Sequence, residues 1–126
     1  MWWHIWIVSK NQGNRYFNED EKWYRNEILE TLEVIAKQEC IMEVNTKGYY
    51  KGETNETYPG KWILQAAKTL GIAVHLASDA HHPEYIRSGF GYGLKQLQSV
   101  GYQKTLIMLD NCWQDSSLIE KKLHIL

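Results

Sequence analysis

This sequence of 126 residues has almost no excess of positive or negative charge, because 14 basic side chains nearly balance 15 acidic ones and leave a net charge of −1. A protein that binds nucleic acid or an anionic membrane through its overall field carries a clear excess of positive charge. The balance therefore gives no electrostatic reason to expect either partner, and we expect neither.

Long apolar runs and paired cysteines are lacking as well. No apolar stretch approaches the roughly 20 residues of a membrane span. The apolar segment 1–8 has neither the basic start nor the small-residue cleavage site of a signal peptide. Cys40 and Cys112 stand far apart, without the close spacing of cysteine metal ligands. We interpret them as reduced thiols and predict a cytoplasmic protein.

Hydrophobic side chains, by contrast, are plentiful. They make up 44% of the chain against 23% charged residues, which is enough for one ordinary globular core. The length predicts a single domain over residues 1–126. Residues 1–9 are atypical of that domain, because three of the six tryptophans gather at positions 2, 3 and 6.

Apolar spacing predicts three helices. Asn18 and Glu21 form a capping-box-like start, and an apolar face recurs at helical spacing behind them, which predicts a helix over 19–38. The other two helices are expected over 59–70, between Pro59 and Gly71, and over 91–100, ended by Gly101.

Three short apolar runs predict strands over 40–45, 72–77 and 104–109, with a loop over 46–59 and a helix or tail from Ser116. Strands that begin about 32 residues apart, with a helix between them, favour right-handed parallel βα units. A closed (β/α) barrel needs about 250 residues. The sequence therefore predicts an α/β fold, either a small open sheet or a piece of such a barrel.

The best candidate site follows the strand predicted over 72–77. Asp79 and His81 stand two residues apart where that strand ends, and the ends of parallel strands carry the sites of α/β proteins. A carboxylate and an imidazole together suit zinc, manganese or iron. From spacing alone, the alternative is that Asp79 caps the next turn while His81 lies on the surface.

Other polar residues carry weaker signals. His75 lies inside an apolar strand, as hydrogen-bonded core histidines do, and His82 precedes a proline, as turn residues do. Glu43 and Asn45 alternate on one strand, so either one points to the site or Glu43 forms a salt bridge. The basic residues near strand ends that are candidates to hold a phosphate, or else solvated surface charges, are Lys10, Arg15, Lys51 and Arg87.

Several segments together resemble one family, the histidinol-phosphatases of the PHP (polymerase and histidinol phosphatase) superfamily. The likeness covers roughly residues 10–113 and corresponds to the C-terminal half of these enzymes. The matching segments are Asn14–Phe17, Glu43–Thr46, Tyr58–Pro59, Leu70–Ile72, Ser78–His81 and Gly89–Phe90.

The resemblance implies a distorted, TIM-like (β/α)7 barrel with two or three divalent metal ions, Zn, Mn or Fe, at the strand ends. It also implies hydrolysis of a small phosphate ester, L-histidinol phosphate, to L-histidinol in histidine biosynthesis. Asp79 and His81 take the positions of metal ligands, and His4 falls on an earlier ligand. Lys10, Lys51 and Arg87 are the candidates for the substrate phosphate.

The chain also departs from the family. Trp3 stands where the family has Gly, Trp6 stands where it has Asp, and the opening His-x-His pair has no counterpart. We therefore expect a C-terminal portion of the barrel that is inactive alone and that either self-associates or needs the N-terminal half. The alternatives are a non-catalytic remnant with a weak metal site and another PHP-type phosphoesterase.

Overall fold

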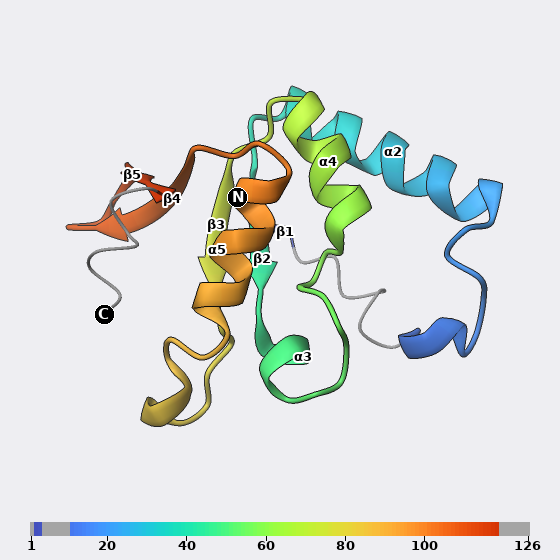
Figure 1. The fold of residues 1–126 in the computed structure, drawn as a ribbon. Coiled ribbons are helices and arrows are strands. Elements are labelled where there is room, and N and C mark those ends of the chain that lie inside the picture. Colours follow the sequence, from blue (N-terminus) through green and yellow to red (C-terminus); the bar gives the residue numbers. More distant parts are fainter. Residues whose placement is uncertain (1, 4–10, 119–126) are drawn as a thin grey trace.

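The computed structural model describes residues 2–3 and 11–118. Helices (α), 3-10 turns (η) and strands (β) follow one another along the chain (Figure 1). The elements are β1 (Trp2–Trp3), η1 (Gln12–Asn14), α2 (Lys22–Lys37), β2 (Ile41–Asn45), α3 (Lys47–Tyr50), α4 (Lys61–Thr69), β3 (Val74–Ala77), η2 (Pro83–Tyr85), α5 (Phe90–Ser99), β4 (Lys104–Leu109) and β5 (Cys112–Ser117). This order confirms the α/β class.

A parallel sheet of three strands, in the order β1-β2-β3, forms the centre of the described chain. Its register pairs Met42 with Val74 and Asn45 with Ala77. Figure 1 shows α2 and α4 together on one side of the strands and α5 beside β3. The parallel βα arrangement expected for β2 and β3 is therefore present.

The core is built from the apolar face of α2, from alternate residues of β2 and β3 and from apolar residues of α4. Along β2 and β3 the buried residues alternate with partly exposed ones, which puts every second side chain against the helices. On α2 the buried face recurs at helical spacing. The residues buried in these elements and in α4 are Tyr24, Ile28, Leu32, Ile35, Met42, Val44, Ile63, Leu64, Ala67, Val74 and Leu76.

The predicted capping pair forms a turn just before the first long helix, whose N-cap is Glu21, without a side-chain cap hydrogen bond. The Asn18 backbone N–H donates to Glu21 Oε1 at 3.2 Å, and Asn18 Oδ1 accepts from the Asp20 backbone N–H at 2.9 Å. These bonds close the turn at Asn18–Glu21, and neither involves an N–H of the helix itself. The helix starts at Lys22, three residues later than predicted, because the Asn18 turn occupies the residues before it.

Each long helix ends in the same way before its strand. After α4 the Gly71 N–H donates to Lys68 O at 3.1 Å and the Ile72 N–H donates to Ala67 O at 3.0 Å, which is a Schellman ending. The same pair of bonds follows α2 at residues 39–40 and α5 at residues 101–102. The helix stops predicted at Gly71 and Gly101 are confirmed.

Two predictions about the chain path are wrong. The loop expected over 46–59 contains the one-turn helix α3. The strand β4 does not extend the parallel sheet but pairs antiparallel with β5 in a separate two-stranded sheet. Asp110 and Asn111, both at positive φ, form the tight turn between Leu109 and Cys112.

The hairpin nevertheless stays in contact with β3 through side chains. The His75 ring nitrogen Nδ1 lies 2.9 Å from Leu106 O, and the His75 ring lies 5.1 Å from the Trp113 ring. His75 is thus hydrogen-bonded, as expected, but it is partly exposed rather than a core residue. The helix or tail predicted from Ser116 begins inside β5, which runs to Ser117, and its remainder lies beyond the described residues. No helix in residues 2–3 and 11–118 is long and apolar enough to cross a membrane.

Candidate functional site

The ends of β2 and β3 bring a lysine and an aspartate together. Asn45 and Ala77 are the last paired residues of the two strands. Two residues beyond each of them, Lys47 Nζ lies 2.9 Å from Asp79 Oδ2. Because adjacent parallel strands run level with each other, positions equally far beyond the last pair meet at the same edge of the sheet.

Hydrogen bonds on both sides hold the backbone around Asp79. Tyr50 Oη donates to Ser78 O at 2.8 Å, and the buried Ser78 Oγ donates to Ile86 O at 2.8 Å. Asp79 itself has a φ of 48°, in the left-handed region that aspartate tolerates better than most residues. The turn after β3 is therefore fixed by contacts from α3 and from the segment behind η2.

His81 is exposed and is oriented by the same turn. Its Nδ1 lies 3.1 Å from the carbonyl oxygen of Asp79. A carbonyl only accepts hydrogen bonds, so Nδ1 carries the proton, and in the neutral ring Nε2 keeps its lone pair. Histidines that bind metals are commonly oriented by such a bond to a backbone carbonyl.

Asp79 and His81 form one wall of a cavity of about 280 Å³. Two aromatic rings also line it: Tyr50 and Tyr85 stack at 5.6 Å, and Lys51 Nζ lies 4.1 Å from the centre of the Tyr85 ring. The cavity is lined by Lys47, Tyr50, Lys51, Asp79, His81, His82 and Tyr85. Two ammonium groups against one carboxylate favour an anionic ligand.

Protonation in this cavity follows from its contacts. The hydrogen bond to Asp79 raises the pKa of Lys47 above its ordinary value, although burial acts in the opposite direction. Burial raises the pKa of Tyr50, while the nearby Lys47 ammonium lowers it. At neutral pH, Lys47 is thus a cation and Tyr50 is a neutral phenol whose proton is donated to Ser78 O.

The residues predicted from the sequence are only partly brought together. Asp79, His81 and Lys51 line one cavity, whereas the exposed Arg87 is not among its lining residues. His4 and Lys10 lie outside the described residues.

The polar residues of β2 have local roles. Asn45 Nδ2 donates to Glu43 Oε1 at 2.9 Å, and Asn45 Oδ1 accepts from the Lys47 backbone N–H at 2.8 Å. This second bond starts the turn that carries Lys47 toward Asp79. His82, expected to be a turn residue, also forms part of the cavity wall, with its ring 6.1 Å from that of Tyr85.

Sequence reasoning missed Lys47, Tyr50 and Tyr85. One signal was available for Lys47, because it precedes Asp79 by 32 residues, which is the spacing of the strand starts. The two tyrosines give no signal, since the sequence predicts a loop where α3 lies and aromatic residues are common in this chain.

Asp79 and His81 are the metal-ligand candidates that the structure describes. Their carboxylate oxygen and free imidazole nitrogen suit zinc, manganese or iron. Among the side chains the structure describes, however, no group of three or more His, Cys, Asp or Glu residues lies close enough together to hold a metal ion. Catalytic zinc sites use three protein ligands. The described donors therefore fit a divalent ion without completing its site.

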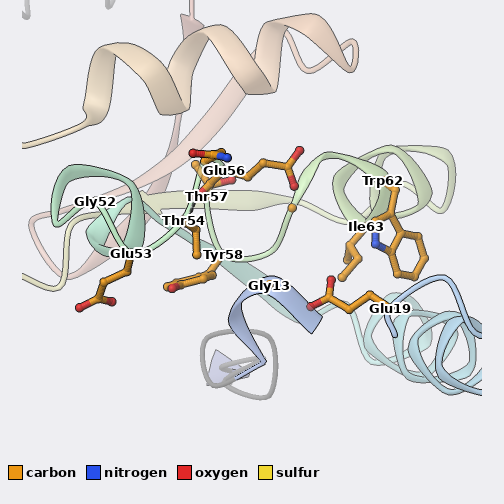
Figure 2. A pocket seen from close by; sticks show the side chains of 12 residues that line it. Gly13, Glu19, Gly52, Glu53, Thr54, Glu56, Thr57, Tyr58, Trp62 and Ile63 are labelled. Atoms are coloured by element: carbon orange, nitrogen blue, oxygen red, sulfur yellow. Dashed lines mark hydrogen bonds between the residues drawn. The ribbon is translucent and has the colours of Figure 1, made fainter. Parts of the chain in front are cut away.

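A larger cavity, of about 500 Å³, lies beside the segment 52–60 and the start of α4 (Figure 2). Three carboxylates, Glu19, Glu53 and Glu56, are placed around it. Like charges repel, so this cavity is unsuited to a phosphate ester. The cavity at Asp79 is the better candidate for an anionic ligand.

Comparison with known proteins finds two that are similar in sequence to this chain. A protein from Deinococcus radiodurans named probable histidinol-phosphatase is 36% identical over 73 residues, which are 58% of this chain and 28% of that protein. One from Thermotoga maritima with the same name is 32% identical over 91 residues, 71% of this chain and 38% of that protein. No protein-family model matches the chain. The chain thus spans well under half the length of either relative, and the similarities support a histidinol-phosphatase-like relationship.

Proposed function

We propose that this chain forms part of the active site of a metal-dependent phosphomonoester hydrolase of the PHP superfamily that converts L-histidinol phosphate to L-histidinol. The main support is that Asp79 and His81 lie at the end of β3 and line a cavity together with two lysines. The chain that forms this cavity is similar to two probable histidinol-phosphatases. The α/β units would be part of a distorted (β/α)7 barrel. A cytoplasmic location agrees with the two free cysteines, Cys40 and Cys112.

Asp79 Oδ and His81 Nε2 would hold a zinc, manganese or iron ion, together with His4 and with donors beyond those described. Such an ion, when bound, supplies positive charge to the phosphoryl oxygens and lowers the pKa of a coordinated water. The turn bonds from Tyr50 and Ser78 keep Asp79 and His81 in fixed positions.

Lys51 is the residue best placed to bind the phosphoryl group of the ester. Its ammonium lies over the rings of Tyr85 and Tyr50, at 4.1 and 5.8 Å from their centres, so it faces the cavity. No ion pair between Lys51 and a carboxylate is present in the described part of the chain. Its charge is therefore available to a phosphate, whereas that of Lys47 is shared with Asp79.

We further propose that the 126 residues alone do not turn over the substrate. Phosphoryl transfer needs the nucleophile, the phosphoryl oxygens and the leaving oxygen held in fixed geometry. Loss of several ligands removes more than the roughly 10²–10⁴-fold that one general acid or base contributes. A complete site then requires further ligands, supplied either by another part of the protein or by an associated protein.

The test is phosphate release from L-histidinol phosphate in the presence of Mn²⁺ or Zn²⁺. The chain alone should not exceed the metal blank. A chimera in which this chain replaces the matching 91-residue segment of the Thermotoga maritima relative should hydrolyse the ester. Asp79→Asn should abolish that hydrolysis, because an amide is a much poorer ligand than a carboxylate.

Asp115→Asn is the matched control, since Asp115 also pairs with a lysine, Lys104, at 2.7 Å but lies on the hairpin away from the cavity. It should leave the chimera active. A folded but inactive chimera, or hydrolysis by the isolated chain that persists in Asp79→Asn, would refute the proposal.

A further inference from the structure

The ion pair between Lys47 and Asp79 has a consequence for metal binding. Asp79 offers the one carboxylate among the residues that line the cavity, and its Oδ2 lies 2.9 Å from Lys47 Nζ. We propose that Lys47 competes with divalent cations for Asp79 and thereby sets how tightly this site takes a metal ion. This inference rests on the proposed function only in taking Asp79 as a metal ligand.

The contact is built in by the fold. The parallel register places residues 47 and 79 level with each other, and the Asn45 side chain accepts the Lys47 backbone N–H at 2.8 Å. On the other side, the bonds to Ser78 hold the turn that carries Asp79. Because both backbones are fixed independently of the ion pair, only side-chain freedom is lost on pairing. The ammonium therefore occupies Asp79 when no metal ion is bound.

The pair is also open to displacement. The two side chains keep 33% and 32% of their surface exposed, so a hydrated cation can approach the carboxylate. Ion pairs of this exposure contribute little net stability, so separating them costs little free energy. A divalent ion that binds Asp79 while the ammonium stays in place meets a like charge a few ångströms away. A metal ion therefore binds Asp79 more tightly once Lys47 has moved away.

Displacement of Lys47 from Asp79 also changes the net charge that the cavity offers to an anionic ligand. A released Lys47 lines the same space as Lys51, and its charge is then no longer neutralised by Asp79. Two uncompensated ammonium groups attract a phosphate ester more strongly than one. Metal and anionic ligand are thus expected to bind with positive coupling through this lysine.

The experiment is a titration of the whole chain with Mn²⁺, in which free Mn²⁺ is followed by electron paramagnetic resonance. Lys47→Met should bind Mn²⁺ at least tenfold more tightly than the wild type. Lys51→Met removes the same charge from the same cavity without touching Asp79, so its affinity for Mn²⁺ should change less than threefold. Adding Asp79→Asn to Lys47→Met should remove the gain.

Circular dichroism in EDTA checks that each variant is folded, and Lys47→Gln replaces Lys47→Met if the latter is not. Equal affinity of the wild type and the folded lysine variant would overturn the inference. So would an equal gain in Lys51→Met, or a gain that survives Asp79→Asn. The readout is binding rather than hydrolysis, so an inactive chimera would refute the proposed function and leave this result standing.

Discussion

Replacement of Gly89 by alanine should destabilise the chain more than a matched glycine replacement elsewhere. Gly89 precedes α5 with a φ of 74°, and a Cβ built there would lie 2.9 Å from Thr46 Cβ and 3.3 Å from Thr46 Oγ1. Contacts this close between non-bonded atoms force one side to move. The prediction therefore depends on whether Thr46 can give way.

Thr46 is held from several directions. It is fully buried, its N–H donates to Ala77 O at 2.9 Å, and its Oγ1 donates to Ser88 O at 2.7 Å. Its methyl group also faces Gly93, where a Cβ would lie 3.0 Å away. A left-handed alanine costs about 1–2 kcal/mol, and overpacking of a filled interior costs about 1–3 kcal/mol. Gly89→Ala should thus lower the free energy of unfolding by about 2–5 kcal/mol.

Gly71→Ala is the control for the backbone term. Gly71 has the same φ of 74°, but a Cβ there meets nothing within 4 Å. Its replacement should cost only the left-handed term, about 1–2 kcal/mol. Urea denaturation followed by circular dichroism gives both values. If the two variants lose the same stability within about 0.5 kcal/mol, Thr46 is not the fixed obstacle described, and the reasoning is refuted.

The remaining predictions concern the end of α2, the hydrogen bond of one buried tyrosine and the pKa of another. Glu39 ends α2 at a φ of 51°, so Glu39→Gly should raise the free energy of unfolding by about 0.5–1 kcal/mol in urea denaturation, the relief of strain exceeding the extra freedom of the unfolded chain. Tyr102→Phe should cost about 1–2 kcal/mol because the Tyr102 hydroxyl donates to the buried Ile72 O at 2.9 Å, whereas Tyr24→Phe should cost nothing, since the Tyr24 hydroxyl has no partner among the described residues. Burial, with a smaller effect of Glu19, raises the pKa of Tyr24 from 10.0 to about 12. The unfolded chain therefore loses this proton at lower pH than the folded chain, and the free energy of unfolding should fall from pH 10 to pH 12. A Tyr24→Phe variant whose denaturation midpoints fall as steeply over this range would contradict this.

Regular elements could be predicted because short-range rules decide them. The turn at Asn18–Glu21, the apolar face of α2 and the stops at Gly71 and Gly101 all depend on contacts within a few residues. The position of Asp79 after a buried strand follows from the same apolar run. These features need no knowledge of which segments meet in space.

The errors arose where distant contacts decide. The pairing of β4 with β5 depends on a turn at Asp110 and Asn111, which lacks the glycine that usually signals such a hairpin. The helix α3 has only four residues, too few for any periodicity to show. The cavity wall of Tyr50 and Tyr85 requires α3 and η2 to meet, and each aromatic residue alone is compatible with an ordinary core position.

The register of the sheet connects the core to the site. Met42 faces Val74 and Val44 faces Leu76, and all four side chains are buried, so a shift by one residue would expose one strand's apolar face. That same register, continued two residues beyond Asn45 and Ala77, sets Lys47 against Asp79. The packing of the interior therefore fixes the central charged contact of the site, and the turn bonds to Ser78 only orient the groups that the sheet has already brought together.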